Sequence, residues 1–369
     1  MTQALLQELS NSDIQWMNAK GEQQEIPKDK VLKLEENSAD CFHILLDGTL
    51  SVALTPKSDD PLAKAFAALE GNDRSNLEIT RLSHGEVVGE NTLLGLKNKG
   101  VTIKTLEKCL LLSIPLTEFQ LKSKQDRAFA ARFYRAIAVL YLNRVEKMLE
   151  RLGRKNFAQS QPVRDVLYIF GQLHDSDLDW AIANGIVQKV IAQTNLIRQG
   201  GPVDALYLLL EGKMTVFFES SGNNPLTSIF ASIENKEKAT ETSGKAIALL
   251  QKGEIIGEAP FIDGRLPYAT VQAKEDSLVL TLNRSLLMSK LQQDIGFAAR
   301  FYQAISTLLA HKLQGVIGRL STSRRTYTGG QSLSNIIEYE DELDENLLEQ
   351  MSLAATRFDW MLKKLKGIA

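Results

Sequence analysis

Residues 253–271 read GEIIGEAPFIDGRLPYATV, and the rest of the chain is interpreted around this stretch. Its order predicts a strand, a tight turn at Gly257, a short helical turn and a second strand. Glycine lets backbone N–H groups approach an anion closely, and the N-terminus of a helix favours negative charge. Both features indicate a phosphate site. Because a carboxylate repels phosphate, we expect Glu258 to accept hydrogen bonds from a sugar hydroxyl of the same ligand.

The chain contains an internal repeat with two offsets. An offset of 164 relates residues 12–16 (SDIQW) to 176–180 (SDLDW) and residues 45–48 (LLDG) to 209–212 (LLEG). An offset of 168 relates residues 85–90 (GEVVGE) to 253–258 (GEIIGE), and FAARFY at 129–134 recurs unchanged at 297–302. The four-residue difference lies in a loop around residues 71–84 of the first copy. A duplication explains both offsets, and it predicts one fold present twice.

Each copy has the same pattern of predicted elements. A helical segment comes first (13–19 and 177–184), and β-rich runs follow, such as 205–218 with the hairpin signal Glu211-Gly212. An insert begins at Pro61 or Pro225, where apolar spacing favours a small helix over an irregular loop. A strand at 278–282 precedes a long closing helix, which spans 296–319 here and 128–151 in the first copy. Strands followed by helices define an α+β fold.

The pattern predicts two domains, 1–152 and 166–320, joined by a polar linker at 153–165. Residues 321–369 begin with a flexible, acidic stretch and end in an amphipathic helix. The apolar face of that helix contains Leu347, Leu348, Met351, Ala354, Phe358, Met361, Leu362 and Leu365. We expect this face to pack on the protein's own β-roll, and the alternative is docking to an unknown protein partner or a second subunit.

The composition excludes several classes of function. A formal charge of -2 argues against non-specific binding of nucleic acid. The two cysteines, Cys41 and Cys109, fit a reducing compartment, and the four histidines are scattered without the spacing of a metal site. No apolar run is long enough to span a bilayer, and the N-terminus lacks the basic region of a signal peptide. We therefore expect a cytoplasmic protein without a metal.

The repeated stretch resembles the phosphate-binding cassette of the cyclic-nucleotide-binding domain family. The resemblance covers roughly residues 13–150 and 177–318. It implies two tandem β-rolls of the double-stranded β-helix (jelly-roll) type, each with flanking helices, and a cyclic nucleotide, cAMP or cGMP, as the ligand. It also implies that the cassette glycine and glutamate position the cyclised ribose phosphate. The positions that match the cassette frame are Gly257, Glu258, Ala269 and Thr270 in the second copy, and Gly89, Glu90 and Thr102 in the first.

The arginine that pairs with the phosphate in this family does not match. The family places it nine residues after the glutamate, where this chain has Pro267 or Lys99. A basic residue lies two positions earlier in each copy, at Arg265 and Lys97. Lysine does not reproduce the bidentate fork of arginine, and losing one charge-assisted contact weakens binding by one to two powers of ten, on the order of 1.5–3 kcal/mol. Arg265 is open to three interpretations: a phosphate partner, an exposed turn residue or a contact to another protein or the other copy. Glu258 has the alternative role of capping the short helix.

Two functions remain in view. The first is a regulatory sensor that binds a cyclic purine nucleotide and relays binding through the closing helices. The second is a scaffold of non-binding tandem domains that meets a protein partner, and self-association through the closing helices fits either. A DNA-binding regulator like the catabolite activator protein is rejected because no helix-turn-helix with a basic recognition helix follows the second copy. No enzyme signature is present.

Overall fold

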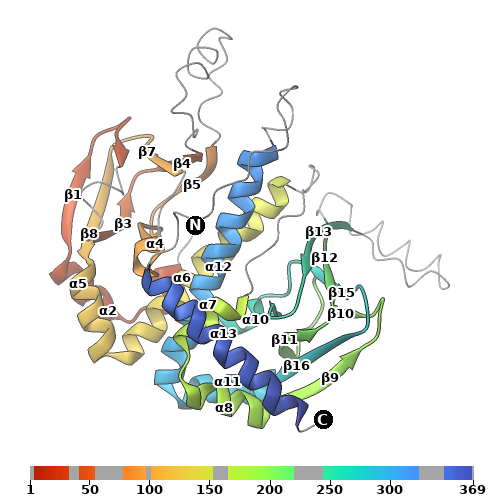
Figure 1. Cartoon of the computed structure of the whole chain (residues 1–369). Coiled ribbons are helices and arrows are strands. Elements are labelled where there is room, and N and C mark those ends of the chain that lie inside the picture. Colours follow the sequence, from red (N-terminus) through yellow and green to blue (C-terminus); the bar gives the residue numbers. More distant parts are fainter. Residues whose placement is uncertain are drawn as a thin grey trace. The chain divides into compact units, whose positions relative to one another are not determined.

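The structure is a computed structural model, and the residues it describes are 4–32, 41–54, 78–96, 101–152, 165–219, 244–323 and 345–367. The chain divides into two compact units, Met1–Arg144 and Val145–Ala369, and the boundary falls inside a helix (Figure 1). The predicted insert helices after Pro61 and Pro225, and the residues predicted as linker at 153–164 and as flexible acidic stretch at 324–344, lie outside the described residues.

Unit 1 begins with two short helices, α1 (Ala4–Glu8) and α2 (Asn11–Lys20). Two four-stranded antiparallel sheets follow, in the orders β1-β8-β3-β6 and β2-β7-β4-β5. Their strands are β1 (Glu22–Ile26), β2 (Val31–Leu32), β3 (Cys41–Asp47), β4 (Leu50–Leu54), β5 (Glu78–Leu82), β6 (Val87–Val88), β7 (Val101–Thr105) and β8 (Cys109–Pro115). The remaining helices are α4 (Glu90–Leu93), α5 (Leu116–Gln125) and α6 (Arg127–Leu152).

Unit 2 repeats this plan. Helices α7 (Asp165–Gln172) and α8 (Asp175–Asn184) precede sheets of the orders β9-β16-β11-β14 and β10-β15-β12-β13. The strands are β9 (Ile186–Val190), β10 (Asn195–Ile197), β11 (Ala205–Glu211), β12 (Met214–Phe218), β13 (Lys245–Leu250), β14 (Ile255–Ile256), β15 (Thr270–Ala273) and β16 (Ser277–Asn283). Helix α10 (Ala259–Ile262) lies between β14 and β15, and three helices follow β16, namely α11 (Arg284–Gln293), α12 (Ile295–Ser323) and α13 (Glu345–Lys366).

The predicted α+β fold with two β-rolls is confirmed, and the match between units extends to irregularities. The β3–β8 pairing shifts register between Leu45 and Asp47, and the β11–β16 pairing shifts between Leu209 and Glu211, at the same offset of 164. Each roll closes around an apolar core, which includes Leu45 and Leu111 in unit 1 and Leu209 and Val279 in unit 2. The sheets stack because alternate side chains of each strand point into this core.

The closing helices begin at matching caps and are tied to the helix before the roll. Asp294 accepts a hydrogen bond from the Phe297 N–H at 2.8 Å, which satisfies a free donor at the start of α12. Arg300 of α12 forms a two-point ion pair with the buried Asp177 of α8, with Nε to Oδ2 at 2.7 Å. Asp126, Arg132 and Asp13 make the same contacts in unit 1. In each unit, the N-terminus of the closing helix is therefore capped and tied by an ion pair to the helix before the roll.

Helix α13 differs from the prediction in what it covers. Its buried face is formed by Ala354, Phe358, Met361, Leu362 and Leu365. It packs mainly on α7, with fewer contacts to α8, rather than on the strands of the roll as expected (Figure 1). The reason is that α7 is apolar around most of its surface and needs a second helix to cover it. The partner contact predicted through Leu347–Leu365 stays a prediction.

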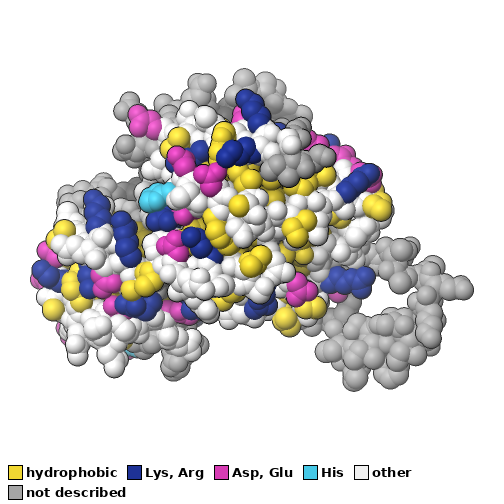
Figure 2. All heavy atoms as spheres, turned by 90° about the horizontal axis from the view of Figure 1, so that it is seen from below, with side chains coloured by type: hydrophobic (Ala, Val, Ile, Leu, Met, Phe, Trp, Pro, Cys, Tyr) yellow, Lys and Arg dark blue, Asp and Glu magenta, His cyan; other side chains and the backbone are white. Residues whose placement is uncertain are grey.

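Three further observations concern the surface, the helices and the ionisable side chains. On the face shown in Figure 2, Lys and Arg side chains lie among Asp and Glu side chains instead of forming a basic stripe. Among the described helices, none combines the length and the apolar character that a membrane span requires. Within the same part of the chain, His, Cys, Asp and Glu side chains form no group of three or more that could hold a metal.

Candidate functional site

The cassette of unit 2 is built on a left-handed glycine. Strand β14 ends at Ile256, and Gly257 follows with a φ of +85°. A Cβ atom at this position would lie 3.1 Å from the carbonyl oxygen of Ala205 and 3.0 Å from the Cδ1 atom of Ile197. Only glycine fits both the backbone conformation and the space. The turn therefore places Glu258 immediately before the short helix α10, in the order that the sequence predicts.

The Glu258 carboxylate is buried and bonded to the closing helix. It makes no side-chain cap to α10, so the alternative role as a helix cap does not describe its contacts. Its Oε1 atom accepts a hydrogen bond from Nζ of Lys312 on α12 at 2.9 Å. The side chain of Glu258 is 6% exposed and that of Lys312 is 25% exposed. This carboxylate is therefore held by an internal cation.

A second carboxylate shares Lys312. Oδ2 of Asp165, the first residue of α7, lies 3.5 Å from Nζ of Lys312 and accepts a hydrogen bond from the Ile255 N–H at 3.0 Å. Burial raises the pKa of Asp165, while Lys312 and the N–H bond oppose that rise. Burial by itself lowers the pKa of Lys312, but the charges of Asp165 and Glu258 outweigh it and raise the pKa well above its usual value. Lys312 thus stays charged between two buried acids.

Unit 1 carries the same contact with a different cation. Arg144 of α6 donates to Glu90 through Nη1 and to the Val87 carbonyl through Nη2 at 2.9 Å. Burial by itself lowers the pKa of Arg144, but the charges of Glu90 and Glu86 outweigh burial, so the pKa lies above its usual value. The positions match, because 258 − 90 and 312 − 144 both equal 168. Both cassettes therefore pair their glutamate with the same position of the closing helix.

Arg265 has acidic partners inside unit 2. Its Nε atom lies 2.9 Å from both carboxylate oxygens of Asp263, and its Nη1 atom lies 2.8 Å from Oε2 of Glu146. The side chain is only 21% exposed, so it is not the exposed turn residue that one interpretation expected. Burial lowers the pKa of Arg265, and Asp263 and Glu146 together more than reverse that effect. A phosphate would have to displace these carboxylates to reach the guanidinium.

The strand side of the cassette is pinned by a glycine turn. The Pro267 carbonyl accepts a hydrogen bond from the Gly200 N–H at 2.9 Å, and Thr270 Oγ1 accepts one from the Gln199 N–H at 3.0 Å. Ala269 and Thr270 are both buried. Burial raises the pKa of the Tyr268 phenol, and the charge of Glu258 raises it further, so Tyr268 lies close to the Glu258–Lys312 pair.

The structure brings some predicted site residues together and leaves others apart. In unit 2, Gly257, Glu258, Ala269 and Thr270 frame one cassette, and Arg265 faces Asp263 and Glu146. In unit 1, three of the five predicted site residues belong to the described part of the chain. Gly89, with a φ of +81°, and Glu90 match this frame, Thr102 lies half-buried on β7, and Lys97 and Lys99 lie outside the described residues.

Sequence reasoning missed the residues that hold the glutamates. Lys312 and Arg144 are cations within helices whose buried faces are otherwise mainly apolar, and they occupy one repeat position. That coincidence was a usable signal, because a buried charge requires a partner of opposite charge. Asp165 gave no such signal, since it is the last residue of the predicted linker at 153–165.

Comparison with known proteins relates part of unit 2 to a described domain family. Residues 187–294 match the family model of the cyclic nucleotide-binding domain. A stretch of 209 residues is 22% identical to a cGMP-dependent protein kinase of Eimeria tenella, covering 57% of this chain and 16% of that protein's length. The chain thus corresponds to a small part of this relative.

Solved structures with a similar fold include regulatory proteins. The regulatory domain of Toxoplasma gondii PKA with cAMP is 15% identical, with 79% of this chain and 89% of that chain covered and a TM-score of 0.26. A regulatory subunit of a cAMP-independent protein kinase A from Trypanosoma brucei is 16% identical, with 80% and 93% covered and a TM-score of 0.27. The Thermus thermophilus catabolite activator protein is 13% identical over 46% of this chain and 70% of its own, with a TM-score of 0.29.

The class of the second unit follows from its family match and its strand order. The residues that match the cyclic nucleotide-binding domain model, 187–294, contain the whole cassette from Gly253 to Val271. Unit 1 repeats the sheet orders, the glycine turn and the buried glutamate of this domain. The chain therefore contains one fold twice, and the second copy is the one that matches the cyclic nucleotide-binding domain model.

Proposed function

We propose that the chain is a regulatory protein without catalytic activity, which binds a cyclic purine nucleotide at the unit 2 cassette and relays binding through α12. The ligand is cAMP or cGMP, and the site consists of Gly257, Glu258 and the strand residues Ala269 and Thr270. Both cysteines are free thiols, which suits a reducing, cytoplasmic setting.

The observation that carries this proposal is the buried Glu258–Lys312 pair. A sugar hydroxyl that donates to Glu258 competes with the Lys312 ammonium for the same carboxylate. Ligand and α12 are then linked: a nucleotide binds more tightly when α12 has released Glu258, and it shifts the protein toward that arrangement. The equivalent Glu90–Arg144 pair gives unit 1 the same device.

A second candidate function is a scaffold whose cassettes bind no nucleotide. The observation that favours it is the set of internal partners of Arg265, which is held by Asp263 and Glu146. Pro267 at the position of the family's phosphate-binding arginine supports the same alternative. In this case the two ion pairs are structural ties only, and the chain acts through a protein partner.

Isothermal titration calorimetry of the full chain with cAMP and cGMP distinguishes the two functions. The sensor proposal expects saturable heat that Glu258→Gln weakens by about 10- to 100-fold, because one charge-assisted hydrogen bond to the ligand is lost. Glu275→Gln is the matched control, since Glu275 is an exposed acid of the same unit. Glu90→Gln reports whether unit 1 contributes.

Lys312→Met tests the coupling directly. If Lys312 competes with the nucleotide, its removal increases affinity, because Glu258 no longer has to be released. Absence of heat at high micromolar nucleotide refutes the sensor proposal and leaves the scaffold. Binding that neither Glu258→Gln nor Lys312→Met alters places the ligand away from this cassette.

A further inference from the structure

Helix α13 packs on unit 2 through an aromatic residue and a neighbouring arginine. Phe358, almost fully buried, lies with its ring centroid 6.0 Å from that of Phe170 on α7 and 5.7 Å from Nζ of Lys252. Arg357 donates to the carbonyl oxygens of Phe170 at 2.7 Å and Leu173 at 2.8 Å, which satisfies acceptors at the end of α7. This surface of α7 and α8 is therefore complementary to an amphipathic helix.

The repeat places an equivalent surface on unit 1. Helices α1 and α2 correspond to α7 and α8 at the offset of 164, and His84 corresponds to Lys252 at the offset of 168. However, 164 − 152 leaves only 12 residues between α6 and α7, while α13 itself is 22 residues long. The first repeat has no room for a helix of its own like α13.

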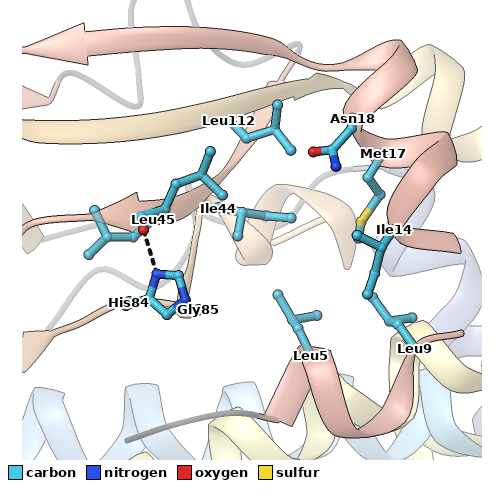
Figure 3. Close-up of a pocket in the computed structure, with 11 residues that line it drawn as sticks. Leu5, Leu9, Ile14, Met17, Asn18, Ile44, Leu45, His84, Gly85 and Leu112 are labelled. Carbon is cyan, nitrogen blue, oxygen red and sulfur yellow. Dashed lines mark hydrogen bonds between the residues drawn. The ribbon is translucent and has the colours of Figure 1, made fainter. Parts of the chain in front are cut away.

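A pocket of unit 1 is lined by His84, the counterpart of the Lys252 that lies beside Phe358 in unit 2 (Figure 3). Leu5 of α1, Leu9 directly after α1 and Met17 of α2 point into it, and the exposed Asn18 and His84 also line it. The imidazole Nδ1 of His84 is hydrogen-bonded to the Leu46 carbonyl, which fixes the ring in place. The remaining lining side chains are apolar, so the pocket offers a dry site beside a polar rim.

The size of the pocket selects its occupant. Its volume is about 70 Å³, whereas a cavity that binds benzene measures about 150 Å³. An aromatic ring such as that of Phe358 does not fit without rearrangement. A leucine or methionine side chain, which is narrower and more flexible, is the better match.

The rim selects the charge of the occupant. On unit 2, Arg357 pairs with Asp175 at 2.8 Å and Lys364 pairs with Asp179 at 3.0 Å. The equivalent residues of unit 1 are neutral, because 175 − 164 gives Asn11 and 179 − 164 gives Gln15. A helix bound here meets neutral side chains at these two positions, so cations opposite Asn11 and Gln15 gain no ion pair.

We propose that the unit 1 pocket and the α1–α2 surface around it bind an amphipathic helix of a partner protein. That helix inserts a leucine or methionine beside His84 and carries uncharged polar residues where α13 has Arg357 and Lys364. The partner protein then supplies to unit 1 the covering helix that α13 of the same chain supplies to unit 2. This inference is independent of nucleotide binding.

Two labelled peptides test the proposal by fluorescence anisotropy with the full chain. The first peptide has the sequence of residues 345–366, and the second carries Phe358→Leu, Arg357→Gln and Lys364→Gln. We expect saturable binding of the second peptide, with the first weaker. Asn18→Arg on the full chain should weaken binding at least tenfold, because it puts a charged side chain at the pocket. Ala19→Arg, at an exposed neighbour that does not line the pocket, is the matched control.

A gain-of-binding variant makes the test independent of folding defects. Asn11→Asp with Gln15→Asp recreates the two carboxylates of unit 2 on an exposed surface. It should strengthen binding of the unmodified first peptide by about two- to tenfold, while the uncharged second peptide gains nothing. The proposal is overturned if the second peptide shows no saturable binding at millimolar concentration, or if Asn18→Arg and Ala19→Arg act alike. A concentration-dependent dimer that Asn18→Arg abolishes would assign this surface to a second copy of the chain instead.

Discussion

Replacing Lys312 with methionine should destabilise unit 2 strongly at neutral pH. The substitution keeps the length of the side chain but leaves Glu258 and Asp165, each 6% exposed, without their shared cation. Removing one partner of a buried ion pair costs about 3–5 kcal/mol, because the remaining charge is neither paired nor hydrated. Lys312 itself is 25% exposed, so water reaches part of the cluster and the lower end of that range, about 3 kcal/mol, is expected.

The pH dependence identifies the cause of this loss. Burial raises the pKa of Asp165 even with Lys312 present, and without the cation the rise is larger. An acid whose folded-state pKa lies above its unfolded value binds its proton more readily when folded. Its folded state therefore becomes relatively more stable as pH falls through that raised value. The difference in free energy of unfolding between Lys312→Met and the unmodified protein should accordingly shrink from pH 7 toward pH 5.

Urea denaturation followed by tryptophan fluorescence measures this difference. A Trp16→Phe background removes the tryptophan of unit 1, so that Trp180 and Trp360 report on unit 2. Lys189→Met is the control, because Lys189 pairs with Asp276 on the exposed surface and its loss should change little. A loss below about 1 kcal/mol for Lys312→Met, or a difference that grows toward pH 5, would refute the electrostatic reasoning.

Three further substitutions test other parts of the structure. Burial lowers the pKa of His311 to about 4, so the folded state resists protonation of this side chain. As pH falls from 6.5 toward 4, the free energy of unfolding of His311→Phe should therefore rise by up to about 3 kcal/mol relative to that of the unmodified protein. Urea denaturation measures this difference. Gly257→Ala should destabilise by about 2 kcal/mol, more than Gly264→Ala, because both sites have positive φ but only Gly257 is crowded; thermal melts of the two variants compare them. Phe358→Ala should lower the free energy of unfolding of unit 2 by about 3–5 kcal/mol and make α13 the first site of limited proteolysis. Leu353→Ala, at an exposed position of the same helix, should change neither the unfolding free energy nor the cleavage site.

The repeat made most of the fold predictable, because a single pattern had to satisfy two sequences. The two strands at 205–218 and the long closing helices appear where expected. The predicted hairpin is wrong, because β11 pairs with β14 and β16 while β12 pairs with β13 and β15 in the other sheet. The helices α5 and α11 were missed for a local reason. Each runs almost directly into the next helix, and the break is made by one aspartate, Asp126 or Asp294, whose side chain caps the following helix. A single cap residue is a weak signal beside a long helical pattern.

Helix α7 and the position of α13 could not be read from the sequence for a different reason. The segment of α7, DVLYIFGQ, is apolar on nearly every side, so it lacks the alternation with polar residues that marks a surface helix. Its need for a covering helix appears only in three dimensions. The apolar face of α13 was recognised, but the choice between strands and α7 as its support depends on that tertiary contact.

The candidate site divides in the same way. The tight turn at Gly257 and the short helix after Glu258 appear in the predicted order, because backbone conformation and motif order are local properties. The contact of Glu258 with Lys312 spans 54 residues and depends on how α12 crosses the cassette. Likewise, the partners of Arg265 lie two residues away at Asp263 and on another helix at Glu146, and only the first is a local feature.

The two buried glutamates themselves argue for a ligand. A buried ion pair contributes little to stability compared with apolar side chains of similar volume, because both charges must leave water. A scaffold that only has to hold α6 and α12 in place gains nothing from a carboxylate at Glu90 and Glu258. Yet the two repeats keep the glutamate while its partner differs, Arg144 in one and Lys312 in the other. A fixed acid with an interchangeable cation is expected when the acid has a second partner, and a sugar hydroxyl at the cassette is the partner that the sensor proposal supplies.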